Sequence, residues 1–338
     1  RSVMDQFDVI VVGGGSGGCA VAGRLAEAGY SVCLLEAGGR NDTFGVKTPA
    51  MLAFTGPKIN YRYETVPQKG LNGRQGYQPR GRGLGGSSAI NAMIYIRGNR
   101  YDYDNWAQLG CTGWAYDDVL PYFKKAEHNV RGGDEYHGDD GPLWVSEQHW
   151  PNQTSRDFVE AAASLQIPVN HDFNGKRQAG VGMYQVTQRE GERWSAARAY
   201  IEPLRRDRNL DIRIGVTVQK LEITDGRVTG VSYEVAGKRR TVHARGGVVL
   251  CAGAFNSPQI MMLSGIGPAA HLKDHGIEVV DDRPAVGADL QDHIDYVAVF
   301  EAESDVPTGT SLKGTLRMAK ALLEHRRHRT CLLYTSDA

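Results

Sequence analysis

The sequence FDVIVVGGGSGGCAVAGRLAEAGYSVCLLEAG, residues 7–38, decides the fold near the beginning of the chain. Residues 8–12 are rich in β-branched apolar side chains, which predicts a strand buried on both faces. They lead into Gly13, Gly15 and Gly18, which are spaced as G-x-G-x-x-G. In that spacing the first glycine makes a tight turn, the second admits a pyrophosphate and the third lets a helix pack on the strand. The stretch therefore predicts strand, turn, helix and second strand, with phosphates bound at the helix N-terminus.

An acidic residue follows the second expected strand. The helix is expected to stop near Gly29, and residues 31–35 are expected to form that strand. Glu36 comes next, about twenty positions after the fingerprint, where a carboxylate can accept hydrogen bonds from ribose hydroxyls. An acid at this place disfavours the 2′-phosphate of NADP. The fingerprint by itself leaves both FAD and NAD open.

Composition narrows the class of protein. The 338 residues allow two domains or one large α/β unit, and Lys+Arg equal Asp+Glu at 39 each, which indicates no nucleic-acid partner. No apolar run is close to the length of about 20 residues that a transmembrane helix needs, and residues 1–6 do not resemble a signal peptide. The five cysteines form no C-x-x-C, so we expect buried free thiols in a cytoplasmic protein. The ten histidines show no H-x-x-x-H spacing, and we predict no metal.

Two further glycine-rich stretches stand out. Residues 79–98, PRGRGLGGSSAINAMIYIRG, place many small residues before a helix-like segment, where backbone can approach a flat or charged group. The simpler interpretation is a glycine-rich loop with a helix cap at Ser87 or Ser88. Residues 253–267, GAFNSPQIMMLSGIG, follow a buried strand expected over 247–253. We expect a helix that begins at Ser257 and the proline after it.

Residues 81–98 and 253–267 resemble the first and second signatures of the glucose–methanol–choline (GMC) family of flavin oxidoreductases. With the opening fingerprint they give three matches, in the family's order, along nearly the whole chain. The resemblance implies an α/β fold: a Rossmann-like FAD-binding domain of the GMC type with a discontinuous α+β substrate domain whose C-terminal part is missing. It also implies FAD rather than NAD. The attachment is expected to be non-covalent, because the first signature here contains no histidine.

The resemblance also implies an order of domains. Residues 5–145 would be the first part of the FAD-binding domain, with a flavin-covering loop and a helical extension, and residues 146–190 the first part of the substrate domain. Residues 191–293 would return to the FAD-binding domain, and residues 294–330 would begin the second part of the substrate domain.

The end of the chain changes character. Residues 317–329, RMAKALLEHRRHR, predict a basic amphipathic helix, either a solvated face or a surface for peripheral membrane association. Residues 331–338, CLLYTSDA, are similar to a translated transposase adaptor, and we expect them to be a non-native tail rather than a natural one.

Between the signatures the patterns predict local structure. The expected elements are a strand at 143–145, a helix at 155–165, a strand at 180–188, a capped helix at 192–200, strands at 210–215 and 216–223, and a hairpin into 228–235. Helices over 102–123 are expected to pack Trp106, Leu109, Val119, Leu120, Tyr122 and Phe123 in a core. We interpret His137 as structural and give His293 no catalytic role.

The resemblance implies specific cofactor contacts in this chain. Gly13, Gly15, Ser16 and Gly18 would hold the pyrophosphate, Glu36 would hold the adenosine ribose, and the backbone of Val218 would meet the adenine. Ala37 is also expected to contact the cofactor. The residues expected along the flavin and its ribityl chain are Gly83, Gly85, Gly86, Ser87, Asn91, Ala92, Met93 and Ile94. Ala252 and Gly253 are expected to lie close to the cofactor.

The implied reaction is oxidation of a primary alcohol to the aldehyde, with hydride transfer to N5 of the flavin. In the family a C-terminal His with a His or Asn partner takes the hydroxyl proton. We expect neither in this chain, so this chain by itself is expected to be inactive.

The expected substrate is a small alcohol. Residues 180–195 look closer to bacterial aliphatic alcohol dehydrogenases, with a quinone or another electron carrier as acceptor, than to choline dehydrogenases. Choline dehydrogenase is the first alternative, although a quaternary ammonium calls for an aromatic cage or an acid. A lyase of the same fold and a non-catalytic FAD-binding fragment stay open, and an NAD-dependent dehydrogenase is the weakest alternative. The expected location is the cytoplasm, with the inner face of the cytoplasmic membrane as an alternative.

Overall fold

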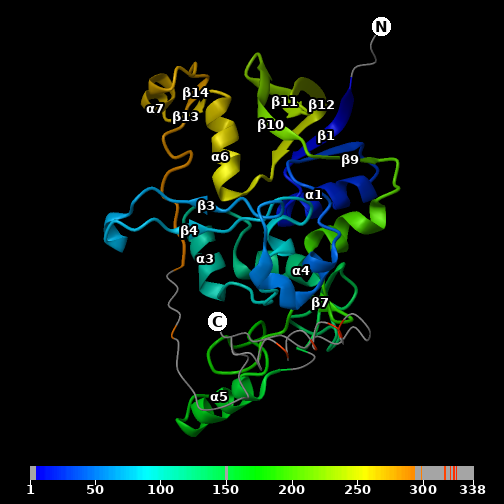
Figure 1. Cartoon of the computed structure of the whole chain (residues 1–338), viewed down its shortest axis with the longest axis vertical. Coiled ribbons are helices and arrows are strands. Elements are labelled where there is room, and N and C mark those ends of the chain that lie inside the picture. Colours follow the sequence, from blue (N-terminus) through cyan, green and yellow to red (C-terminus); the bar gives the residue numbers. More distant parts are fainter. Residues whose placement is uncertain are drawn as a thin grey trace. The chain divides into compact units, whose positions relative to one another are not determined.

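The computed structural model of the chain describes residues 5–148 and 151–293, with isolated positions 298, 316, 320, 323 and 325 beyond them. These residues belong to two compact units, labelled by element in Figure 1. Unit 1 comprises Arg1–Asp42, Thr55–Ile90 and Ser195–Asp295, and unit 2 comprises Thr43–Phe54, Asn91–Trp194 and Tyr296–Ala338. Apart from the isolated positions, the expected basic helix at 317–329 and the tail at 331–338 lie outside the described residues. Within the described part of the chain, no helix is both long and apolar enough to cross a membrane.

A six-stranded sheet organises unit 1. Its order is β10-β11-β12-β1-β2-β9, and β1 pairs in parallel with both β2 and β12. β9 extends the parallel part beside β2, whereas β10, β11 and β12 form an antiparallel meander. The Rossmann-like arrangement predicted from the sequence is confirmed. The strands are β1 (Gln6–Val12), β2 (Val32–Glu36), β9 (Leu210–Ile214), β10 (Thr217–Thr224), β11 (Arg227–Val235) and β12 (Lys238–Leu250).

The central strands are apolar on both faces because each face meets its own core. Successive side chains of a strand point to opposite faces. Accordingly Val11 and Leu34 enter the core that also contains residues of α1 (Ser16–Glu27). Ile10 and Leu35 enter the other core, together with residues of the β10–β12 meander. Because these four side chains are almost completely buried, truncating one to alanine would cost about 2–5 kcal/mol.

Two glycines allow α1 to follow β1 without a gap. Gly13 has a φ of 97°, a left-handed conformation that side chains disfavour. A Cβ on Gly18 would lie 1.8 Å from the carbonyl oxygen of Gly13, which no side chain can accommodate. Behind them α1 buries small residues, Cys19, Ala22 and Ala26, and so lies close to the sheet. These glycines and small residues therefore place the N-terminus of α1 directly at the end of β1.

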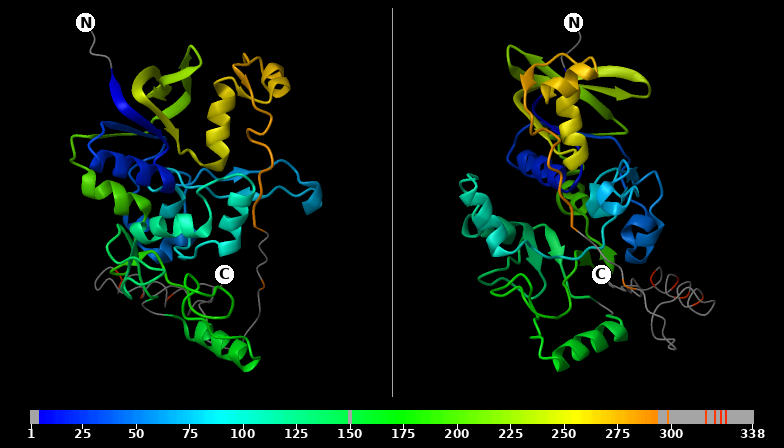
Figure 2. Two further views of the ribbon diagram at one scale, coloured as in Figure 1. Left: turned by 180° about the vertical axis from the view of Figure 1, so that it is seen from behind. Right: turned by 90° about the vertical axis from the view of Figure 1, so that its left-hand side faces the viewer.

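The parallel strands β1 and β2 pack their other face against the β10–β12 meander and a second helix. The hairpin between β10 and β11 turns at Asp225 and Gly226, whose φ values are 51° and 73°, as expected for this Asp-Gly pair. Helix α6 (Gly253–Leu263) directly follows β12 and stands beside these strands in both views of Figure 2. The expected start at Ser257 is wrong: the N-cap is Ala252, and its backbone amide donates a hydrogen bond to the Ser257 hydroxyl at 3.0 Å.

The remaining elements of unit 1 are short: β3 (Tyr63–Glu64), η2 (Lys69–Leu71), β4 (Tyr77–Gln78), η3 (Gly86–Ala89), a π-helical turn η4 (Ala197–Ile201), η5 (Glu202–Leu204), β13 (Ile266–Gly267), α7 (Ala269–Asp274) and β14 (Asp281–Asp282).

Unit 2 combines helices with two-stranded pieces of sheet. Strand β5 pairs in parallel with β6, and β7 pairs antiparallel with β8. Val145 and Val186 are completely buried there, and Met93 is 1% exposed. The elements are α2 (Phe44–Lys47), η1 (Pro49–Phe54), α3 (Arg100–Gln108), α4 (Tyr116–Ala126), β5 (Glu127–Asn129), β6 (Leu143–Val145), α5 (Gln153–Ser164), β7 (Gln188–Arg189) and β8 (Glu192–Arg193).

Three local expectations are wrong where long-range contacts override the pattern. The expected helix over 192–200 begins instead as strand β8, because buried Arg193 donates hydrogen bonds to the carbonyls of Val46 and Asn91. The expected strand over 180–188 is mostly irregular and makes only isolated bridges at Val181 and Val186 before β7. In place of the helix expected to be capped by Ser87 or Ser88, one 3-10 turn forms over Gly86–Ala89, and its N-cap is Gly85 rather than a serine.

The apolar residues of α3 and α4 also differ from expectation. Val119 is buried, but Trp106, Leu109 and Tyr122 are 45%, 76% and 71% exposed. The aromatic rings contact one another at the surface, as Trp106 does with Trp114 at 6.1 Å between centroids. The pattern correctly marked an apolar face, but that face is not a core in the described part of the chain.

Candidate functional site

A cavity of about 500 Å³ opens in unit 1 where β1, β2 and β12 end. This is the edge of a parallel sheet at which α/β proteins bind ligands. Most of the residues predicted to contact the cofactor line it, namely Gly13, Gly15, Ser16, Glu36, Ala37, Gly86, Ser87, Val218, Ala252 and Gly253.

Two helices direct their N-termini at this cavity. Gly15, the N-cap of α1, and Ala252, the N-cap of α6, both line it, and no described side chain caps either helix. The first turns contain no acidic residue. The first intrahelical bond at α1 is donated by the Cys19 amide to Gly15 O at 2.9 Å, so the amides before it point out of the helix. Unsatisfied amides and the positive ends of two helix dipoles favour an anion such as a pyrophosphate.

Glu36 joins three segments at the cavity wall. Its side chain is 6% exposed, and its Oε2 accepts a hydrogen bond from the Gly14 amide at 2.8 Å. Its Oε1 accepts two more, from Gly38 N at 2.7 Å and Gly83 N at 2.8 Å. The carboxylate thus connects the end of β2, the β1–α1 turn and the glycine-rich loop. Two carboxylate oxygens have about four acceptor positions, so one is left over for a ribose hydroxyl.

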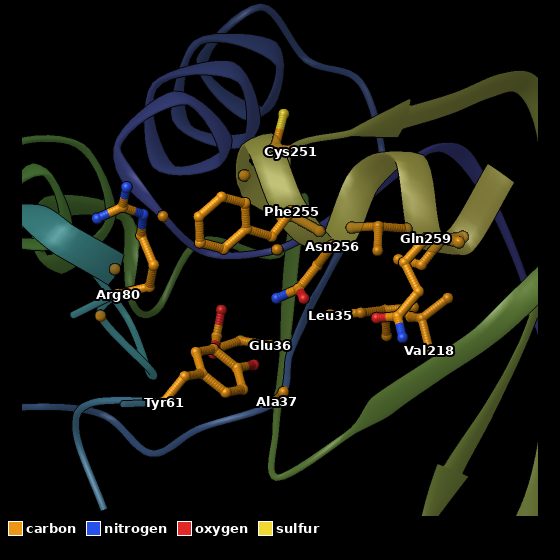
Figure 3. Close-up of a pocket in the computed structure, with 18 of the residues that line it drawn as sticks. Leu35, Glu36, Ala37, Tyr61, Arg80, Val218, Cys251, Phe255, Asn256 and Gln259 are labelled. Atoms are coloured by element: carbon orange, nitrogen blue, oxygen red, sulfur yellow. The ribbon is translucent and has the colours of Figure 1, made fainter. Parts of the chain in front are cut away.

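Aromatic side chains form part of the cavity wall. Figure 3 shows Tyr61 beside Glu36, and Phe255 and Asn256 projecting from α6. Tyr61 stacks on Tyr63 at 5.1 Å, and the Tyr63 hydroxyl donates to Asn256 Oδ1 at 2.9 Å. Burial, reinforced by the Glu36 charge, raises the pKa of Tyr61 to about 12, so its hydroxyl stays neutral. These flat side chains fit a planar ring system.

Arg80 adds the one basic side chain among the residues that line this cavity in the described structure. Its guanidinium lies 4.9 Å from the centroid of the Phe255 ring. Sequence analysis missed Arg80 and the aromatic wall. Nothing in the local pattern around Tyr61 and Tyr63 connects these tyrosines with a helix about 190 residues later.

The predicted residues that do not line the cavity support it from behind or lie in unit 2. The Gly85 amide donates to Gly14 O at 2.8 Å, Gly83 contacts Glu36, and Gly18 packs under Gly13. Asn91, Ala92, Met93 and Ile94 belong to unit 2. There Met93 adopts a φ of 62° with its side chain buried, a conformation that costs about 1–3 kcal/mol and often marks functional segments.

The thiols near the cavity are poor nucleophiles. Burial raises the pKa of Cys251, which lines the cavity, and raises the pKa of Cys19 behind it to about 12. All four cysteines within the described residues are free. In the same part of the chain no three His, Cys, Asp or Glu side chains are grouped to hold a metal ion.

Histidine is also missing from the described lining of the cavity. His137 lies in unit 2, 5% exposed, with Nδ1 2.9 Å from Glu127 Oε1 and Nε2 3.0 Å from Asp172 Oδ2. Its partners are these carboxylates rather than the neighbouring Asp139 and Asp140. The ring is an internal structural bridge, in agreement with its interpretation from the sequence.

Comparison with known proteins agrees with this geometry. The family model described as GMC oxidoreductase matches residues 7–295. The chain is 44% identical over 294 residues to an oxygen-dependent choline dehydrogenase from Rhizobium etli, covering 86% of this chain and 53% of the relative. It is 45% identical over 312 residues to an alcohol dehydrogenase [acceptor] from Pseudomonas putida, covering 90% and 56% of the two chains. The chain therefore spans about half the length of the curated relatives it matches.

Solved structures show the same relation. Pyridoxine 4-oxidase from Mesorbium loti matches with a TM-score of 0.78 and 34% identity, over 82% of this chain and 55% of the other. Formate oxidase from Aspergillus oryzae RIB40 matches with a TM-score of 0.77 and 28% identity, over 83% and 51%.

Proposed function

Because the chain belongs to the GMC oxidoreductase family, whose members are FAD-binding flavoproteins, we propose that it forms the FAD-binding part of an enzyme that oxidises a primary alcohol to its aldehyde. One observation carries the proposal: two uncapped helix N-termini and the Glu36 carboxylate meet at one cavity at the carboxyl edge of the parallel strands. FAD, when bound, supplies the hydride acceptor for oxidation of the alcohol carbon.

The residues of the chain would bind and orient this cofactor. The amides at the start of α1 would hold the pyrophosphate, where Gly15 leaves open space: a Cβ there would be 3.9 Å from its nearest neighbour. Glu36 would accept a hydrogen bond from the adenosine ribose, and Val218 would meet the adenine. Gly83, Gly85, Gly86 and Ser87 would lie along the flavin. Since residues 81–98 contain no histidine, we propose that FAD is held without a covalent bond.

We further propose an aliphatic primary alcohol as substrate and a quinone or another electron carrier as acceptor. The similarity to the alcohol dehydrogenase [acceptor] supports this choice, and the similarity to the choline dehydrogenases keeps choline as the alternative. The proton acceptor would be a histidine that is not among the residues described as lining this cavity. Peripheral membrane association, suggested by the basic sequence at 317–329, is a separate part of the proposal.

Cofactor binding can be tested with a matched pair of glycine variants. Gly15→Val places a side chain in the cavity from a backbone with a φ of −75°, which valine tolerates, so the fold should be unchanged. Gly70→Ala adds a Cβ with nothing within 4 Å, at a site outside the cavity. In fluorescence titrations Gly15→Val should bind FAD at least about tenfold more weakly, and Gly70→Ala should bind it normally. Equal FAD affinity in both variants would contradict the placement of the pyrophosphate.

The reaction is tested on the whole protein, because the chain spans half of its relatives. Visible spectra are recorded before and after adding primary alcohols of increasing length, and choline, without an electron acceptor. Bleaching of the flavin by the aliphatic alcohols would support the proposal, and bleaching by choline alone would favour the alternative. Bound flavin that no alcohol bleaches would argue for the lyase.

A further inference from the structure

Unit 2 contains a second cavity, of about 360 Å³, with a cationic and aromatic lining. The charged residues that line it are Arg97, Arg100 and Lys176, and among its described lining residues none is acidic. Three rings, of Tyr116, Tyr136 and Phe173, complete its apolar surface. Its size lies within the range of small-molecule sites, about 300–1,000 Å³. Nothing in the proposed oxidation of an alcohol uses this cavity.

The two segments that form its walls are fixed to each other by hydrogen bonds. The Arg97 amide donates to Asn174 Oδ1 at 2.7 Å, and Gln178 Nε2 donates to Arg97 O at 2.9 Å. Asn99 Nδ2 donates to Gln178 Oε1 at 3.1 Å, and Asn99 also caps α3. Because side chains of each segment bond to the other, the cavity is formed without a ligand and needs little ordering on binding.

Arg97 retains binding capacity in spite of its burial. The residue is 7% exposed; its Nη2 lies 2.7 Å from Glu127 Oε2 and its Nη1 donates to Tyr136 O at 2.7 Å. Its Nε is buried with no hydrogen-bond partner among the described residues. Leaving a charged donor unsatisfied is unfavourable, so an acceptor at this place would be stabilised.

Arg100 and Lys176 add charge that the protein does not neutralise inside the cavity. Arg100 pairs with Asp117 at 3.0 Å, but both side chains are more than half exposed and Asp117 is not part of the lining. The Arg100 guanidinium lies 4.2 Å from the centroid of the Tyr116 ring. An aromatic ring therefore lies beside one of the cations of the lining, which suits a ligand with an anionic head and a flat body.

We propose that this cavity binds a small organic anion, a carboxylate or a phosphate ester, whose planar apolar body lies against Tyr136 and Phe173. Arg100 and Lys176 hold its anionic group, and Arg97 Nε offers a further donor to the same group. The two possible head groups share the same recognition by guanidinium and ammonium, and the probes below distinguish them.

The test is a calorimetric titration of the purified chain, saturated with FAD so that phosphate-containing probes do not enter the first cavity. The probes are benzoate and phenyl phosphate, with inorganic phosphate to test the need for a ring and benzamide to test the need for charge. We expect saturable binding of benzoate or phenyl phosphate that weakens with added salt. Inorganic phosphate should bind more weakly, and benzamide should not bind measurably.

The variants decide whether the site is this cavity. Arg100→Gln and Lys176→Gln each remove a partly or fully exposed lining charge and should weaken the better probe about tenfold, without a change in melting temperature. Arg177→Gln is the matched control, because it removes the same charge from the neighbouring exposed residue, which does not line the cavity. No saturable binding of either aromatic probe at 10 mM or below (about −2.7 kcal/mol by affinity arithmetic) would overturn the proposal. So would an equal loss in Arg177→Gln.

Discussion

The ion bridge at His137 makes a quantitative prediction about stability and pH. Burial alone would lower the pKa of His137, but the hydrogen bonds and negative charges of Asp172 and Glu127 outweigh burial and raise it to about 9 from an ordinary value of 6.5. Neighbouring charges on other segments are Arg97, which pairs with Glu127, and Arg131, which lowers the pKa of Asp172 together with His137. The folded protein therefore holds a proton on His137 at neutral pH.

The sign follows from linkage between protonation and folding. Since the pKa of His137 is higher in the folded than in the unfolded chain, its contribution is complete below about pH 6.5 and is lost as pH rises through about 9. The difference of about 2.5 pH units, at 1.36 kcal/mol each, corresponds to about 3 kcal/mol. Replacement by glutamine, His137→Gln, keeps one hydrogen-bond donor and removes the titrating charge.

The assay is urea unfolding of both proteins from pH 6 to pH 10. The free energy of unfolding of the original chain should fall by about 3 kcal/mol more than that of His137→Gln across this window. His271→Gln, which changes an exposed histidine of α7, is the control and should follow the original curve. Parallel pH curves for the original chain and His137→Gln would refute the assignment of a bound proton to this ring.

Two further predictions concern the cavity at the ends of β1, β2 and β12. Glu36→Gln should lower the free energy of unfolding by about 2–4 kcal/mol in urea titrations, because one of the three amides that the carboxylate satisfies would face an NH₂ group; an unchanged midpoint would contradict this. Gly18→Ala should abolish FAD binding and lower the melting temperature, since its Cβ would collide with Gly13 O, whereas Gly17→Ala, with nothing within 4 Å, should raise stability by about 0.5–1 kcal/mol. Equal melting temperatures for these two alanine variants would show that α1 is not packed on β1 as described.

Short-range patterns were sufficient to predict the centre of unit 1. The strand, turn, helix and strand of residues 7–38 are encoded by periodicity and by glycines whose roles are local. The Asp225–Gly226 hairpin is equally local, because the turn type requires those residues. The turn between β1 and α1, and with it one part of the cavity wall, was therefore predictable from the sequence.

What the sequence did not indicate depends on contacts between distant segments. The aromatic wall arises because the Tyr63 hydroxyl donates a hydrogen bond to the Asn256 side chain. Arg193 becomes part of a strand because its guanidinium donates hydrogen bonds to backbone carbonyls about 100 to 150 positions earlier in the chain. The amphipathic spacing of α3 predicted which side chains share a face of the helix. It did not predict whether another part of the protein covers that face, and Leu109 is in fact exposed. Such outcomes follow from tertiary packing, which outweighs propensities of a few tenths of a kcal/mol per residue.

The triple attachment of Glu36 has a consequence for protein engineering. Exchanging the acid at the end of the second strand is an obvious route toward accepting a 2′-phosphorylated dinucleotide, because it removes a negative charge near the ribose. In this chain the same exchange would release Gly14, Gly38 and Gly83 together, and so loosen the turn and the loop that shape the cavity. If Glu36 meets the ribose as proposed, one side chain serves both nucleotide binding and scaffold integrity, so any redesign would first need new acceptors for three backbone amides.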